Sequence, residues 1–294
     1  MTLQKTIVAA GRKIGPGEPC FIIAEAGSNH NRNLKTALAL IDAAAEAKAD
    51  AIKFQTYSAE TLYSKFTPMH SSSKLKPWDL IKSVELPREW QGRLKKHADK
   101  KGIIFFSTPF DFAAVDELEA LKVPMHKVAS MELPDLTLIA KVARTGKPVL
   151  ISTGGAFLEE IEQAVAVCRK AGNDKIILLQ CTTSYPAPAK DLNLRAMAAL
   201  AAAFGTPVGY SDHSLGIHIA SAAVALGASV IEKHYTLSRK SKGPDHPFAV
   251  EPEELARMVS DIREVEAALG DGLKTGPVAC ELENYKIAHR TIHA

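Results

Sequence analysis

Short apolar segments rich in Ile, Val and Phe alternate along the whole chain with Ala-rich segments at helical spacing, and this alternation limits the possible folds more than any other feature. It is typical of repeated strand–helix units that build a parallel sheet. Eight apolar segments are present, which is the number that a (β/α)8 barrel needs. We predict strands at residues 21–26, 51–56, 103–109, 126–130, 148–153, 176–182, 208–212 and 230–236.

The segments between these strands are long enough to form right-handed crossover helices. We predict helices at residues 34–47, 88–100, 112–121, 136–144, 158–171, 194–204, 217–226 and 252–269. An open doubly wound sheet is the alternative architecture. Because the GxGxxG pattern of a dinucleotide site does not follow the first strand, we favour an α/β fold of the (β/α)8 TIM-barrel type.

The length of 294 residues fits one barrel with a short segment at each end. We predict an N-terminal hairpin capping the barrel at residues 1–18, the catalytic barrel at 19–272 and a C-terminal extension at 273–294. The longest expected loop spans residues 57–86 and is predicted to be an active-site lid. Its side chains Lys65, Lys74, Lys76 and Trp78 are expected to fold over the barrel mouth when substrate binds.

The composition excludes several classes of protein. The net charge of +3 comes without a long basic run, so nucleic acid is not an expected partner. The longest nearly apolar stretch, residues 217–231, is shorter than the roughly 20 residues of a membrane helix. The four cysteines form no CxxC pair, which favours reduced thiols and a cytoplasmic location over a disulfide framework or a zinc site.

Two lysines fall near predicted strand ends, where a barrel carries its active site. Burying Lys53 and Lys127 there is costly unless each has an anionic partner. The neighbouring strand ends are rich in Ser, Thr and Gly, which supply hydroxyl and backbone N–H donors to anions. We therefore predict a site for a phosphate and a carboxylate. The alternative is that the lysines form structural ion pairs with Glu25, Glu132 or Glu232.

Two histidines indicate a metal. His213 and His234 end the seventh and eighth predicted strands, so they are expected to be neighbours in space. Two imidazoles with carboxylate or water oxygens suit Mn, Fe, Co or Zn and leave positions open for a substrate. After the eighth strand, a turn at Gly243-Pro244 is expected to present Asp245 and His246 to the same mouth. Without the neighbouring histidines, a plain polar turn would be the preferred interpretation.

The motifs at these strand ends resemble those of the sialic acid synthase family, over about residues 20–270. They are FIIAEAGSNHN at 21–31, IKFQT at 52–56, FFSTPFD at 105–111, KVASME at 127–132, STGG at 152–155, CTTSYPAP at 181–188, GYSDHS at 209–214, EKHYTL at 232–237 and GPDH at 243–246. The resemblance implies a homodimeric enzyme that condenses phosphoenolpyruvate with an N-acetylated amino sugar, such as N-acetylmannosamine, with the help of Mn²⁺.

The resemblance also assigns roles to single residues. It makes His213 and His234 the metal ligands. Around phosphoenolpyruvate it places Lys53, Thr108, Lys127, Ser130, Ser152, Thr183 and Ser211. Toward the sugar it places Glu25, Gln55, Tyr185 and Asp245. The expected catalytic set is Glu25, Lys53, Lys127 and Glu132, in which either glutamate takes a proton from the water that adds to C2 of phosphoenolpyruvate.

Two departures from the family pattern are visible. Thr183 stands where the best-described members carry Asn, and Thr reaches less far toward a phosphate. Family members also continue into a small antifreeze-like domain, which we do not expect within residues 273–294. Two other functions stay open: a synthase for a phosphorylated sugar, using Arg239, Lys240 and Lys242 for a second phosphate, and a catalytically idle sugar-binding barrel.

Overall fold

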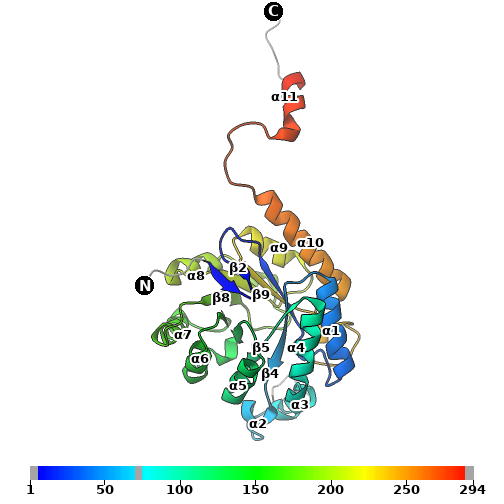
Figure 1. Cartoon of the computed structure of the whole chain (residues 1–294), viewed down its shortest axis with the longest axis vertical. Coiled ribbons are helices and arrows are strands. Elements are labelled where there is room, and N and C mark those ends of the chain that lie inside the picture. The colour runs from blue at the N-terminus through cyan, green and yellow to red at the C-terminus, as the bar shows by residue number, and fades with distance from the viewer. Residues whose placement is uncertain (1–5, 70–74, 289–294) are drawn as a thin grey trace, which may run out of the picture.

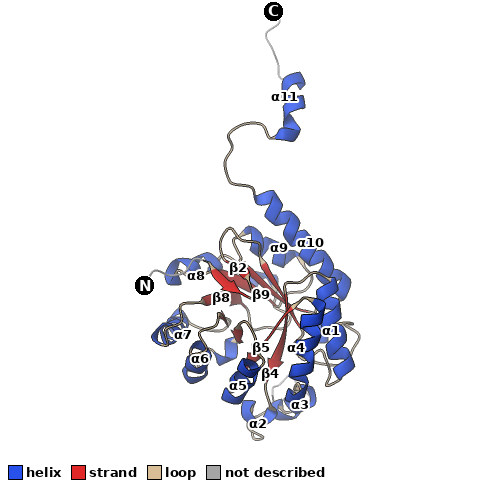
Figure 2. Ribbon diagram, in the orientation of Figure 1, coloured by secondary structure: helices blue, strands red, loops and turns tan. Residues whose placement is uncertain are grey.

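The computed structural model describes residues 6–69 and 75–288, and its central feature is an eight-stranded parallel sheet surrounded by helices (Figures 1 and 2). The strands of this sheet are β3 (Phe21–Glu25), β4 (Ala51–Thr56), β5 (Ile104–Pro109), β6 (His126–Val128), β7 (Val149–Ser152), β8 (Ile176–Cys181), β9 (Val208–Asp212) and β10 (Val230–His234). Each predicted strand is therefore present, with bounds that differ by at most two residues at either end.

The order of the strands identifies the sheet as a barrel. It runs β5-β4-β3-β10-β9-β8-β7-β6, and every neighbouring pair is parallel. The strands that come first and last in the chain, β3 and β10, are hydrogen-bonded to each other, with Glu25 beside His234. The two strands at the ends of the order, β5 and β6, also contact each other. An open doubly wound sheet does not pair its first strand with its last, so the barrel prediction is confirmed.

The helices form the outer layer (Figure 2). They are α1 (Leu34–Glu46), α2 (Ala59–Leu62), α3 (Pro77–Val84), α4 (Gln91–Lys101), α5 (Phe112–Ala120), α6 (Leu136–Ala143), α7 (Leu158–Lys170), α8 (Ala196–Phe204), α9 (His218–Ala225), α10 (Pro252–Leu269) and α11 (Leu282–Ala288). Short 3-10 helices are η1 (Arg88–Trp90), η2 (Ser130–Glu132), η3 (Ala189–Asp191), η4 (His246–Phe248) and η5 (Ala279–Glu281). Within the described residues, no helix is long and apolar enough to cross a membrane.

Side-chain caps fix where several helices begin. Asn33 accepts a hydrogen bond from the Thr36 backbone N–H before α1, and Asp111 accepts one from Ala114 before α5. Asp135 accepts from both Thr137 and Leu138 at the start of α6. These caps satisfy backbone donors that a helix leaves free at its first turn. They hold the loops that follow the strands in place, and those loops surround the barrel mouth.

An antiparallel hairpin precedes the barrel, as predicted. It pairs β1 (Ile7–Ala9) with β2 (Arg12–Ile14), and Ile7 and Ile14 are fully buried in the same apolar core as the barrel strands. At the other end of the chain, α11 lies away from the barrel and its described residues are exposed (Figure 1).

The long segment after β4 is more structured than a loop. It contains α2 and α3, and the Glu85 carboxylate ties them together through the Ala59 N–H at 2.9 Å and the Lys82 ammonium at 2.9 Å. Two of the residues expected to fold over the mouth contact each other, because the Lys65 ammonium lies 4.8 Å from the Trp78 ring centroid. Lys74 lies outside the described residues.

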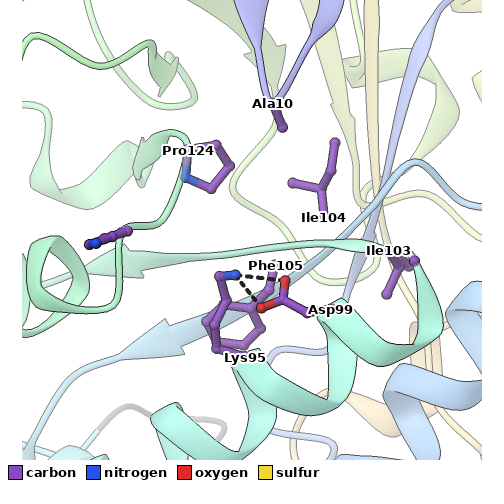
Figure 3. Close-up of a pocket in the computed structure, with 9 residues that line it drawn as sticks. Ala10, Lys95, Asp99, Ile103, Ile104, Phe105 and Pro124 are labelled. Atoms are coloured by element: carbon purple, nitrogen blue, oxygen red, sulfur yellow. Dashed lines mark hydrogen bonds and ion pairs between the residues drawn. The ribbon is translucent and has the colours of Figure 1, made fainter.

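A hollow lies at the amino-terminal end of the barrel, beside the hairpin turn (Figure 3). Its labelled lining is Ala10, Lys95, Asp99, Ile103, Ile104, Phe105 and Pro124. The Lys95 ammonium donates to both carboxylate oxygens of Asp99 at 2.6 Å, and the other labelled residues are apolar. The labelled side chains of this hollow therefore offer one ion pair and no histidine.

Candidate active site

Polar side chains from the carboxyl ends of the strands meet in one cavity at the barrel mouth. It is lined by Glu25, Lys53, Gln55, Thr108, Lys127, Ala129, Ser130, Ser152, Tyr185, Ser211, His213, Glu232 and His234. Most of the residues predicted for the site are in this set. They come from strands that lie far apart in the sequence, and barrel closure brings them together.

Lys53 lies at the centre of the charged part of the cavity. Its ammonium is 2.7 Å from Glu25 Oε2, 3.0 Å from Thr108 Oγ1 and 3.7 Å from Glu232 Oε2. Burial opposes the charged form of Lys53, but the two carboxylates outweigh it and raise the pKa of Lys53. The lysine is therefore charged and already paired, so the ion-pair contacts are present and the predicted anion site would use the same ammonium group.

Lys127 faces the same cavity from β6. Its ammonium donates to Ser152 Oγ at 2.6 Å and lies 3.7 Å from Glu232 Oε1. Burial lowers the pKa of Lys127, although Glu232 opposes this. The Ser152 hydroxyl and the lysine together form a donor pair of the kind that binds phosphate or carboxylate oxygens.

The Gly-rich turn after β7 approaches the cavity closely. The Gly154 N–H donates to Ser130 Oγ at 3.1 Å, and Ser130 Oγ is 3.0 Å from the Cys181 sulfur. A Cβ atom at Gly154 would lie 2.6 Å from that sulfur, a distance that side chains do not tolerate. Glycine is required here because a Cβ atom would collide with Cys181 and Thr183 behind the cavity residue Ser130.

Glu232, which the sequence predicts only as a possible ion-pair partner of the two lysines, also lines the cavity. It lies between Lys53 and Lys127, and it accepts a hydrogen bond from Ser211 Oγ at 3.0 Å. Burial alone raises the pKa of Glu232, but the charges of Lys127 and Lys53 outweigh burial and lower it to about 2. The period of two along β10 places Glu232 on the same face as His234, and this signal was sufficient to find it.

Glu25 has a different environment from Glu232. Its Oε1 accepts a hydrogen bond from Gln55 Nε2 at 2.7 Å, and its Oε2 faces Lys53. Burial raises the pKa of Glu25 to about 7, with Lys53 opposing the rise and Glu232 adding to it. The pKa values of two carboxyl groups in one cavity are therefore shifted in opposite directions, which is the arrangement that acid–base chemistry uses.

The two histidines lie together at the other side of the cavity. Their ring centroids are 5.6 Å apart. The His213 Nδ1–H donates to the Thr182 carbonyl at 2.7 Å, which fixes the tautomer and leaves Nε2 with its lone pair. Burial lowers the pKa of His213 to about 4 and also lowers that of His234, so both rings are neutral at pH 7.

These features fit a metal held by two imidazoles. His234 Nδ1 is buried without a hydrogen-bond partner, and the Asp245 carboxylate lies 4.0 Å from it. A ring nitrogen fixed by a carbonyl, as in His213, is typical of metal-binding histidines. Among residues 6–69 and 75–288, no group of three or more His, Cys, Asp or Glu side chains is arranged to hold an ion. Oxygens of water or substrate would have to complete the coordination.

Tyr185 lies over the two histidines. Its ring centroid is 4.2 Å from that of His213 and 5.9 Å from that of His234, and the residue is 52% exposed. The ring therefore faces the opening of the cavity while its inner side packs on the imidazoles. The expected contact of Tyr185 with the sugar stays a prediction.

Three predicted residues lie outside the cavity lining. Asp245 accepts hydrogen bonds from the Ser28 N–H and hydroxyl at 3.0 and 2.9 Å, and its carboxylate lies 4.0 Å from His234 Nδ1. Thr183 is exposed beside the Gly-rich turn, with its Oγ1 3.4 Å from where a Cβ of Gly155 would be. Glu132 belongs to η2 and its Oε2 is buried without a partner. Burial raises the pKa of Glu132 to about 7, with Lys127 opposing the rise.

Comparison with known proteins agrees with this geometry. The model of the NeuB family matches residues 40–274. The chain is 43% identical to the N,N'-diacetyllegionaminic acid synthase of Campylobacter jejuni, over 93% of this chain and 84% of that protein. It is 37% identical to the human N-acetylneuraminate-9-phosphate synthase, over 90% of this chain and 75% of that one.

A solved structure shows the same barrel. The N-acetylneuraminic acid synthetase of Leptospira borgpetersenii serovar Hardjo-bovis, crystallised with citrate, superposes with a TM-score of 0.88. The two sequences are 40% identical, and the alignment covers 97% of this chain and 96% of that one. The chain belongs to the NeuB family and is an enzyme of the sialic acid synthase type.

Proposed function

We propose that this enzyme joins phosphoenolpyruvate to the open-chain form of an N-acetylated amino sugar, giving a nonulosonic acid and inorganic phosphate. The observation that carries the proposal is that two buried lysines and a neutral histidine pair share one cavity. The lysines suit a substrate with a phosphate and a carboxylate, and the histidines suit a metal beside a sugar carbonyl. Relatives that make legionaminic and sialic acids support the product class.

The anionic substrate is assigned to the side of the cavity formed by β4, β5, β6 and β7. Lys53, Lys127 and the hydroxyls of Thr108 and Ser152 converge there, with hydrogen bonds of 3.0 Å and 2.6 Å already joining each lysine to one hydroxyl. Because Glu232 lies 3.7 Å from each ammonium, an entering anion can approach both lysines while Glu232 remains hydrogen-bonded to Ser211.

The cofactor in this proposal is a divalent metal, Mn²⁺ by family resemblance, held by His213 and His234. Bound there, it supplies Lewis-acid polarisation of the sugar aldehyde. The residues themselves perform the remaining work. Tyr185 covers the imidazoles and orients the sugar over them, and Asp245 holds Ser28 beside His234 through two hydrogen bonds.

The reaction balances with one water molecule. A bond forms between C3 of phosphoenolpyruvate and the aldehyde carbon, and the aldehyde oxygen takes up a proton to become a hydroxyl group. Water adds to C2 and gives up a proton, and the C2 adduct then loses phosphate to leave a keto acid. Glu25 lines the cavity and Glu132 does not, so Glu25 is the better placed to take the proton from that water. A carboxyl group whose pKa is raised to about 7 is matched to accept a proton near neutral pH.

The structure weakens the case for a phosphorylated sugar. Arg239 was a candidate for a second phosphate, but its guanidinium is 2.7 Å from Glu254 and 3.8 Å from Glu251. Lys240 and Lys242 remain exposed. Phosphate release measured with N-acetylmannosamine and with its 6-phosphate tests this choice. The phosphorylated sugar is included because the human relative is an N-acetylneuraminate-9-phosphate synthase. We expect faster turnover of the sugar without phosphate.

The cellular setting belongs to the same proposal. We place the enzyme in the cytoplasm as a homodimer, with its cysteines reduced. All four cysteines are free thiols, and Cys20, Cys168 and Cys181 are buried. Light scattering on the purified enzyme tests the dimer. The idle-barrel alternative predicts that phosphoenolpyruvate binds but that no amino sugar in a panel triggers phosphate release.

A further inference from the structure

A buried ion pair lies directly behind the wall of the active site. The Lys233 ammonium is 2.9 Å from Asp212 Oδ2, and the two residues are register partners on the parallel strands β10 and β9. Their side chains are 1% and 0% exposed. Because side chains alternate along a strand, this pair points to the helix side of the sheet and not into the cavity.

The neighbours of this pair in sequence are all site residues. Glu232 and His234 flank Lys233, and Ser211 and His213 flank Asp212. All four line the cavity. The pair is therefore placed where it fixes the spacing of the two strand ends that carry the histidines.

Further hydrogen bonds close a ring around the backbone of His213. Asp212 Oδ1 accepts from the Ser214 N–H at 2.9 Å and from its hydroxyl at 2.6 Å. The Lys233 ammonium donates to the Ser214 carbonyl at 2.5 Å. The residues before and after His213 are thus held by one another and by Lys233. The imidazole is held separately, through its bond to the Thr182 carbonyl.

We infer that Lys233 and Asp212 are positioning residues that hold His213 in place for its metal. This buried ion pair is not needed for the stability of the fold, because a protein with a well-packed apolar pair of similar volume in its place is often as stable or more stable. A requirement for geometry explains the pair better, since supports of this kind typically contribute a factor of about 10–100 to metal affinity. The inference rests on the proposed metal role of His213.

The test measures Mn²⁺ binding by the full chain, followed through the electron paramagnetic resonance signal of free Mn²⁺. The main variant carries Asp212→Asn together with Lys233→Met, so that no unpaired charge is left buried. We expect its Mn²⁺ affinity to fall at least about tenfold. Its circular dichroism should stay native, and its phosphoenolpyruvate affinity should change less than its Mn²⁺ affinity.

The matched control is Asp50→Asn, which removes another buried carboxylate at the opposite end of the barrel. Asp50 bonds the Arg263 guanidinium at 2.9 Å and the Ile22 N–H at 2.8 Å. This variant should lose thermal stability and keep its Mn²⁺ affinity. Equal weakening of Mn²⁺ binding in the control would show general loosening of the barrel and would overturn the inference.

Other results are equally decisive. A folded double variant with wild-type Mn²⁺ affinity overturns the positioning role and leaves the proposed function intact. Failure of the wild-type enzyme to bind Mn²⁺ overturns the metal proposal and the inference with it. If the double variant does not fold, Ser214→Ala decides: weakening of about three- to tenfold supports the inference, and unchanged affinity overturns it.

Discussion

The carboxylate of Glu25 and the ammonium of Lys53 face each other across β3 and β4, with Oε2 and Nζ 2.7 Å apart and side-chain exposures of 0% and 3%. Gln55 holds the other Glu25 oxygen at 2.7 Å. Lys53, on the side of the cavity proposed for the anion, therefore contacts Glu25, which is assigned to the side of the sugar. This coupling predicts that changes at Lys53 affect both substrates.

Replacing either cavity lysine should impair the anionic substrate. We expect Lys53→Met and Lys127→Met to raise the KM for phosphoenolpyruvate and lower kcat, with a loss of about 2–5 kcal/mol in kcat/KM, because each variant removes a buried charge from the anion's side. Steady-state phosphate release measures this. Lys95→Met, whose lysine pairs with Asp99 at the other end of the barrel, is the control and should behave as wild type. Folded variants that unfold at a lower temperature but keep normal phosphoenolpyruvate kinetics would favour a purely structural ion pair.

Removal of the metal should stop the reaction. We expect EDTA to abolish phosphate release and Mn²⁺ to restore it, and His213→Ala and His234→Ala each to weaken metal retention, because the two imidazoles are the proposed ligands. Metal content of the dialysed protein is the readout. His97→Ala is a suitable control, since His97 pairs with Asp42 on α1. Undiminished turnover by metal-free enzyme would contradict the assignment.

Tyr185 should act on the sugar more than on phosphoenolpyruvate. Its ring packs on His213 at 4.2 Å and is half exposed at the mouth. We expect Tyr185→Ala to raise the sugar KM about tenfold or more, while Tyr185→Phe, which keeps the ring, retains most of the affinity. A larger effect on the phosphoenolpyruvate KM would place the sugar elsewhere.

Glu132 should make stability depend on pH. Burial raises its pKa from 4.5 to about 7, so the folded state favours the protonated carboxyl. Its contribution to stability is fully present below about pH 4.5 and is lost as pH rises to about 7. Glu132→Gln should therefore raise the free energy of unfolding at pH 8 by an amount on the order of 2–3 kcal/mol, with a smaller gain at pH 5. Urea unfolding at the two pH values measures this, and a gain independent of pH would contradict it.

Much of the barrel could be predicted because its strands are buried on both faces and read as apolar runs. Most of the cavity residues could be predicted for the same reason, because a polar residue at the end of an apolar run is easy to recognise in the sequence. Asp245, Thr183 and Glu132 lie on segments beyond the strands, where side-chain direction depends on turns that local sequence does not define. For Asp245 the structure supplies the missing information, namely its bonds to Ser28.

The segment after β4 was the least predictable part of the fold. The helices α2 and α3 are short, and tertiary ion pairs stabilise them, among them Arg32 with Glu85 at 3.0 Å. Such helices have little intrinsic stability, so their sequence resembles that of a loop. The Pro at the first position of α3 was the available signal.

The central claim is that this cavity makes a new carbon–carbon bond between phosphoenolpyruvate and an amino sugar. The most direct test incubates the purified enzyme with phosphoenolpyruvate, Mn²⁺ and a panel of N-acetylated amino sugars, and analyses the products by mass spectrometry together with phosphate release. The account predicts, for at least one sugar, a product whose mass is that of the sugar plus pyruvic acid, formed in equal amount to phosphate. Binding of phosphoenolpyruvate without such a product for any sugar, or phosphate release that yields only pyruvate, would contradict it.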